Sequence, residues 1–169
     1  MIALALAANH PDRVNRLVLD GLPYWNGVQG KALWERFFLP MFTDTTSYHL
    51  PVLPLSTWEE AKKRNPELPK EMWESAEEIR RRSRLWSRMS LEAISDYDIT
   101  SVGPNVKRPT LLIFGDGDKV RRTENQANND IEGSILKVIP ESPGPAGRHQ
   151  PEAFARLAIQ FLGDQQAPH

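Results

Sequence analysis

Five stretches of the chain carry a clear hydrophobic pattern, and their order predicts a parallel α/β fold. Alanine and leucine dominate the first ten residues, which favours a helix, and Pro11 ends it because the residue before a proline avoids the α region. A threonine followed by a purely apolar run is typical of a strand buried in a parallel sheet. The predicted strands lie at the end of 13–20, at 110–114 and at 134–139, and the helices that flank them are 1–10 and 151–162.

The stretch between the first two predicted strands has a different character. Residues 22–100 hold all five tryptophans and all three tyrosines, and prolines divide them into short segments. We expect helices over 31–38, 57–64 and 70–94, the second of which begins with a Thr57–Glu60 capping box. A loop dense in proline and glycine, residues 140–150, precedes the last helix. The chain therefore reads as an α/β core interrupted by a helical insert.

The opening helix is apolar on every side and lacks a polar first turn. We expect such a helix to be buried, and a buried helix at the very start suggests that something used to precede it. A signal peptide is the alternative, but it requires a positively charged segment before the apolar run, and the chain has none. We therefore expect a cytoplasmic protein.

Composition excludes several classes of protein. The 169 residues are 40% hydrophobic with a net charge of −1, which argues against disorder and against a general attraction to nucleic acid or an anionic membrane. No apolar run approaches the roughly 18–20 residues of a membrane helix. The absence of cysteine excludes disulfides, thiol catalysis and cysteine-based zinc sites. No histidine–carboxylate spacing indicates a metal, and we expect no cofactor.

Three blocks, in order, resemble the α/β-hydrolase fold family: residues 1–21, which include His10-Pro11-Asp12-Arg13-Val14; residues 107–118; and residues 150–162. The first resembles the segment after the family's nucleophile elbow, the second its seventh strand and acid-bearing turn, and the third its last helix. The resemblance implies a partial α/β-hydrolase fold with parallel strands, flanking helices and a helical cap. The implied division is 1–22 and 101–163 for the core, 23–100 for the cap or lid, and 164–169 for a tail.

The resemblance also implies that one part of the site lies elsewhere. Family members carry a G-x-S-x-G turn before the opening helix, and these residues contain no such motif. We expect a truncated gene model or gene, with the serine nucleophile upstream of Met1, and a chain that is inactive alone.

Asp118 is the candidate catalytic carboxylate. It follows an apolar strand, where open α/β sheets place their sites, and glycines at 115 and 117 permit a sharp turn. From the turn alone, Asp116 and Asp118 fit turn formers equally well. The resemblance implies the catalytic role for Asp118, whereas Asp116 is expected to cap the turn.

His149 is the candidate base, and here the sequence departs from the family pattern. A gapless match places Gly144 where the family has its histidine, and His149 lies two residues before Pro151. A rearranged loop could still deliver His149 to Asp118, or His149 could be a solvated histidine at a helix start. Both interpretations stay open.

Other residues suggest the ligand and partners. Trp25, Trp34 and His49 are candidates for a substrate pocket, although tryptophans in an insert more often form its core. The arginine run 80–84 follows glutamates on the same predicted helix, so we expect ion pairs and no nucleic-acid binding. The two function hypotheses are a hydrolase of a small, largely apolar ester and a non-catalytic interaction module that pairs, with another chain or with a second copy of itself, through an exposed sheet edge.

Overall fold

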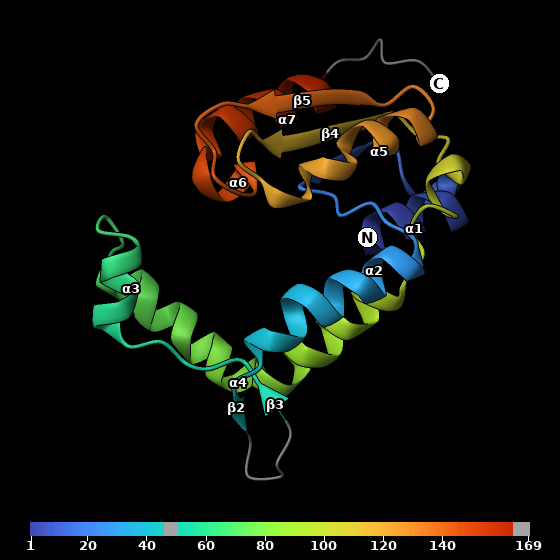
Figure 1. The fold of residues 1–169 in the computed structure, drawn as a ribbon. Helices are drawn as coiled ribbons and strands as arrows, with labels where there is room; N and C mark the ends of the chain where they lie inside the picture. The colour runs from blue at the N-terminus through green and yellow to red at the C-terminus, as the bar shows by residue number, and fades with distance from the viewer. Residues whose placement is uncertain (46–50, 164–169) are drawn as a thin grey trace. The chain divides into compact units, whose positions relative to one another are not determined.

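The computed structural model describes residues 1–45 and 51–163. Contacts divide the chain into two units, one formed by Met1–Gly27 with Asp98–His169 and the other by Val28–Tyr97 (Figure 1). The predicted tail 164–169 lies outside the described residues.

The first unit is built on a parallel sheet, as the apolar runs predicted. Its described strands are β1 (Leu17–Asp20), β4 (Thr110–Gly115) and β5 (Ile135–Ile139), in the order β1-β4-β5. Leu17 pairs with Thr110, and Leu111 pairs with Ile135. Because the strands are parallel, their carboxyl ends meet at one edge of the sheet, where catalytic groups gather in open α/β sheets.

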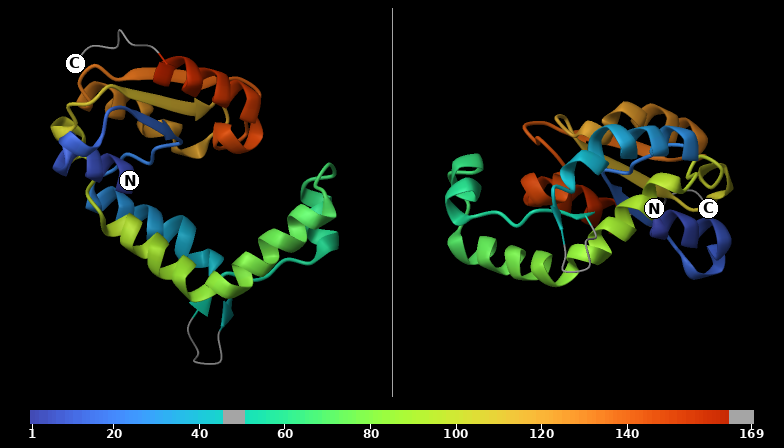
Figure 2. Two further views of the ribbon diagram at one scale, coloured as in Figure 1. Left: turned by 180° about the vertical axis from the view of Figure 1, so that it is seen from behind. Right: turned by 60° about the horizontal axis from the view of Figure 1, so that its bottom comes forward.

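Both faces of β4 are covered, which explains why its sequence is apolar throughout. Leu112 and Phe114 pack on one side with α1 and α5. Leu111 and Ile113 pack on the other side with α6 and α7. Figure 1 shows α5 in front of the sheet and α7 behind it, and Figure 2 gives the opposite view. The bounds of these helices are α1 Ile2–Asn9, α5 Glu124–Asp130, α6 Ala146–His149 and α7 Pro151–Gly163.

The structure corrects two of the sequence expectations in this unit. The segment 140–150 is not wholly a loop, because α6 forms one helical turn inside it. The opening helix α1 is only partly buried: Leu4 and Ala7 are enclosed, but Ile2 is 89% exposed. The physical reason is that the described core packs against one side of α1, which leaves the other apolar side uncovered.

The Val28–Tyr97 unit contains the three predicted helices. A helix, α2 (Gly27–Leu33), continues as a π-helical turn over Trp34–Phe38. The capping box at Thr57 is present at the start of α3 (Trp58–Arg64). The longest helix, α4 (Lys70–Asp96), runs two residues beyond its predicted end. The short strands β2 (Asp44–Thr45) and β3 (Pro51–Val52) pair antiparallel and were not predicted.

Short helical turns connect these elements. They are Pro11–Arg13, Leu39–Met41, Gly103–Asn105 and Lys119–Thr123.

The arginines of α4 are held in ion pairs, as the glutamates that precede them on the same helix predicted. Arg82 donates to Glu78 over 2.8 Å, and Arg80 pairs with Glu77. Arg84 pairs with Asp44. The side chains that looked most like a nucleic-acid contact are therefore engaged with carboxylates of the same unit. Across the described residues, no helix is both long enough and apolar enough to cross a membrane.

Candidate functional site

The carboxyl edge of the sheet gathers the chemistry-bearing side chains of the first unit. β1 ends at Asp20, and β4 leads directly into Asp116 and Asp118. The segment after β5 returns to the same edge through α6, whose last residue is His149. Four titratable side chains from three strand ends thus lie at the edge where this class of fold places its sites.

Asp118 is buried, and only one of its two carboxylate oxygens accepts a hydrogen bond. Its side chain is 9% exposed, and Oδ1 accepts a hydrogen bond from the Val120 backbone N–H over 3.1 Å. Oδ2 is buried and has no hydrogen-bond partner among the residues that the structure describes. Buried carboxylate oxygens are almost always satisfied, so an unpaired one requires an explanation.

The free oxygen of Asp118 points toward the end of β1. A Cβ placed on Gly21 would lie 2.8 Å from Oδ2, and Gly21 has a φ of +58°. A residue other than glycine would therefore be strained at this position and would press against the oxygen. Glycine at this turn leaves Oδ2 free to accept a hydrogen bond from another group.

Asp116 holds the loop after β5, which agrees with its predicted role as a turn cap. Its carboxylate accepts hydrogen bonds from the backbone N–H groups of Ser142 and Glu141, each over 2.9 Å. These two donors hold the pKa of Asp116 below its usual value. The neighbouring aspartates of one turn thus differ: Asp116 is satisfied by backbone, whereas Asp118 keeps one oxygen free.

Asp20 is a site-forming residue that the sequence reasoning missed. Its two carboxylate oxygens accept the backbone N–H groups of Ala146 and Gly147, each over 2.9 Å. The residue before α6 is Pro145, which supplies no side-chain cap. A carboxylate 126 positions away along the chain therefore caps the helical turn that ends at His149. No local signal could have revealed this contact.

His149 lies at the same edge but is not joined to Asp118. Its ring is exposed, and Nε2 lies 3.0 Å from the position that a Cβ on Gly144 would occupy. Within the described part of the chain, no hydrogen bond connects His149 with Asp118, since Oδ2 has no partner. The imidazole thus lies beside residue 144, the position where the resemblance to the family expects a histidine.

The candidate substrate-binding residues fall in different parts of the chain. Trp25 is buried in the first unit. Trp34 is buried in the second unit, where its ring lies 5.5 Å from that of Phe42. His49 lies outside the described residues. Among the residues described, no group of three or more histidine, aspartate or glutamate side chains could hold a metal ion.

Removing the Asp20 carboxylate is expected to loosen α6. We predict that Asp20→Ala lowers the free energy of unfolding by about 1–2 kcal/mol, the range for loss of a helix cap, and that Asp20→Asn, which keeps one acceptor oxygen, lowers it by less. Urea denaturation measures both. Asp12→Ala removes an exposed carboxylate from the same unit and is the matched control. Equal stability of Asp20→Ala and Asp12→Ala would contradict the capping role.

Comparison with known proteins identifies the fold family. The family model described as alpha/beta hydrolase fold matches residues 1–143. The enol-lactonase from Burkholderia xenovorans LB400 superposes with a TM-score of 0.61 at 17% identity, over 95% of this chain and 61% of its own. A hydrolase from Pseudomonas aeruginosa gives a TM-score of 0.55 at 24% identity, over 96% of this chain and 61% of its own. The thioesterase domain from the curacin biosynthetic pathway gives a TM-score of 0.58 at 17% identity, over 96% of this chain and 62% of its own.

These matches concern the fold. The chain spans about three fifths of the length of the solved structures that it resembles. No curated protein matches it.

Proposed function

Because this chain belongs to the alpha/beta hydrolase fold family, we propose that it contributes the catalytic carboxylate, Asp118, and the catalytic base, His149, of a hydrolase. The hydrolase is proposed to cleave an ester or a similar small, largely apolar substrate. The observation that carries the proposal is the buried, unpaired Oδ2 of Asp118 at the carboxyl end of β4. A carboxylate whose second oxygen is free can accept the N–H of a catalytic imidazole.

The proposed reaction is acyl transfer followed by hydrolysis. A serine hydroxyl attacks the ester carbonyl and passes its proton to the His149 imidazole, and Asp118 stabilises the imidazolium that forms. The imidazolium then protonates the ester oxygen as its bond to the carbonyl carbon breaks, so that the alcohol leaves and an acyl-enzyme remains. Water, deprotonated by His149, releases the acid and restores the serine.

The nucleophile is proposed to come from residues other than these 169. A G-x-S-x-G turn occurs nowhere in the sequence. In this family the turn supplies both the serine and one backbone donor of the oxyanion hole. We therefore expect the 169-residue chain to show no significant ester hydrolysis alone.

The position of the His149 ring supports its role as the base. The ring lies against Gly144, so an imidazole occupies space beside the position where relatives carry their histidine, although it arrives from α6. Hydrogen bonds between catalytic groups are often long in ligand-free structures and tighten when substrate binds.

A pair of variants tests His149. In a protein that supplies a G-x-S-x-G nucleophile, we predict that His149→Ala lowers the kcat for a p-nitrophenyl ester by at least a hundredfold, since general-base catalysis contributes about 10²–10⁴. Adding Gly144→His to His149→Ala is expected to restore part of the rate. His10→Ala, at another exposed histidine, is the control. Full activity of His149→Ala would exclude it as the base.

The names of two similar structures bear on the nature of the substrate. One is an enol-lactonase and the other a thioesterase domain, which supports an ester or a similar substrate for this chain. Trp25, Trp34 and His49 stay separate candidates for contacts with an apolar substrate.

The alternative is a non-catalytic module of the same fold. Within the described residues, β1 pairs only with β4, so its other edge offers unpaired backbone groups to a second chain. Size-exclusion chromatography separates the hypotheses when combined with the assay. A stable dimer without any hydrolysis, even when a G-x-S-x-G nucleophile is supplied, would favour the module.

A further inference from the structure

The Val28–Tyr97 unit holds a pocket of its own. Its volume is about 630 Å³, and it is lined only by residues of this unit, from the Leu39–Met41 turn, the segment 53–56, α3 and α4. Small-molecule sites in proteins have volumes of about 300–1,000 Å³. The pocket is therefore large enough for a small ligand and does not involve the catalytic candidates of the first unit.

One wall of the pocket is apolar. Met41 contributes from the Leu39–Met41 turn, and Leu53, Pro54 and Leu55 contribute from the segment that joins β3 to α3. These side chains present hydrocarbon and no hydrogen-bonding group. The wall therefore favours an aliphatic part of a ligand.

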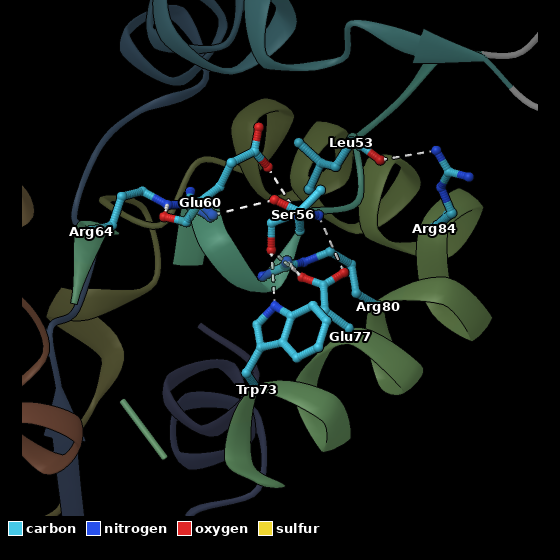
Figure 3. A network of polar contacts seen from close by, with 9 residues as sticks. Leu53, Ser56, Glu60, Arg64, Trp73, Glu77, Arg80 and Arg84 are labelled. Atoms are coloured by element: carbon cyan, nitrogen blue, oxygen red, sulfur yellow. Dashed lines mark hydrogen bonds and ion pairs between the residues drawn. The ribbon is translucent and has the colours of Figure 1, made fainter. Parts of the chain in front are cut away.

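A buried glutamate fixes this wall to α4. Glu77 is 5% exposed, and its Oε1 accepts the Ser56 hydroxyl over 2.6 Å, while the Ser56 hydroxyl oxygen accepts the Trp73 indole N–H over 3.3 Å. Figure 3 shows Ser56 between Glu77 and Trp73, with Arg80 beside the glutamate. Arg84 also donates to the Leu53 carbonyl over 3.3 Å. The apolar segment is thus held from both ends, and the pocket is preformed.

The charged side chains of the pocket leave two cations available. Arg80 is paired with Glu77. Glu60 accepts the Thr57 backbone N–H in the capping box, and this hydrogen bond and the charge of Arg64 both lower the pKa of Glu60. Lys63 makes no ion pair with any of the described residues, and Arg64 donates only Nε, to the Glu60 carbonyl over 3.3 Å. The ammonium of Lys63 and the outer nitrogens of Arg64 therefore remain as donors for an anion.

We propose that this pocket binds a medium-chain fatty acid, with the acyl chain on the apolar wall and the carboxylate at Lys63 and Arg64. The aliphatic wall recognises the chain by excluding water from it. The adjacent cations recognise the carboxylate by charge-assisted hydrogen bonds. A neutral alcohol lacks the charge, and a short anion lacks the chain, so neither matches both features.

Isothermal titration calorimetry on the whole chain tests the proposal, with laurate below its micelle concentration as the probe. Laurate is expected to bind at least tenfold more tightly than dodecanol or acetate. The double variant Lys63→Ala/Arg64→Ala is expected to weaken laurate binding at least tenfold. Lys70→Ala removes an exposed lysine of the same unit that does not line the pocket, and it should change affinity less than twofold.

Several results would overturn the proposal. Dodecanol binding as tightly as laurate would show that the cations are not used, and acetate binding as tightly would show that the wall is not used. Unchanged laurate affinity in the double variant would place the fatty acid elsewhere, as would an equal loss in Lys70→Ala. Lys63 and Arg64 are exposed, so circular dichroism should show both variants folded. The measurement involves no hydrolysis, so it succeeds or fails independently of the proposed reaction.

Discussion

Asp118→Asn is expected to lower the kcat for ester hydrolysis by about 10³–10⁴ in a protein that carries the nucleophile. The asparagine has the same shape and can still accept the Val120 N–H through one oxygen, so the turn is retained. What it loses is the negative charge at the free Oδ2 position, which in the proposed mechanism stabilises the imidazolium and selects the correct tautomer of the base. Steady-state kinetics with a p-nitrophenyl ester measure the change.

Asp116→Asn is the matched control for this variant, because the two aspartates occupy one turn. Asp116 binds the backbone N–H groups of Ser142 and Glu141, and an asparagine side chain can accept through only one oxygen. We expect a lower melting temperature and a kcat within tenfold of the parent. The opposite pattern, with activity lost in Asp116→Asn and kept in Asp118→Asn, would reverse the assignment of the carboxylate.

The parts of the fold that sequence could predict are those with a local cause. The apolar run of β4 follows from burial on both faces of the sheet, and the start of α3 follows from the Thr57 capping box. The glutamates that precede the arginine run on α4 predicted ion pairs such as Glu78–Arg82. Each of these signals lies within a few residues of the element that it specifies.

The parts that could not be predicted depend on distant contacts or on weak patterns. Helix α5 has the sequence Glu-Asn-Gln-Ala-Asn-Asn-Asp, which has no apolar periodicity. Its one hydrophobic residue, Ala127, lies in the core. Helix α6 lies in a segment rich in proline and glycine, and its cap comes from Asp20 on another strand. The position of Asp118 followed from the end of β4, but its free oxygen depends on Gly21, which only the fold brings near.

Gly115→Ala is expected to have the largest effect on stability. Gly115 is the last residue of β4, where the loop after β5 crosses closely above the strand. A Cβ on Gly115 would lie 2.2 Å from the Gly144 carbonyl oxygen and 2.5 Å from the Ser142 carbonyl oxygen. Both are backbone atoms, so the clash cannot be relieved by rotating a side chain. The loop would have to move away from β4, together with the Asp116 contacts that hold it.

We expect Gly115→Ala to reduce the free energy of unfolding by about 3 kcal/mol or more, at the upper end of the range for overpacked sites. Gly163→Ala is the control, because Gly163 ends α7 and a Cβ there would meet nothing within 4 Å. That variant should be unchanged or more stable by about 0.4–1 kcal/mol, since alanine restricts the unfolded chain. Urea denaturation followed by far-ultraviolet circular dichroism compares the two. Similar midpoints would mean that the loop after β5 does not pack against the end of β4, and the arrangement of Asp118, Gly144 and His149 at this edge would fall with it.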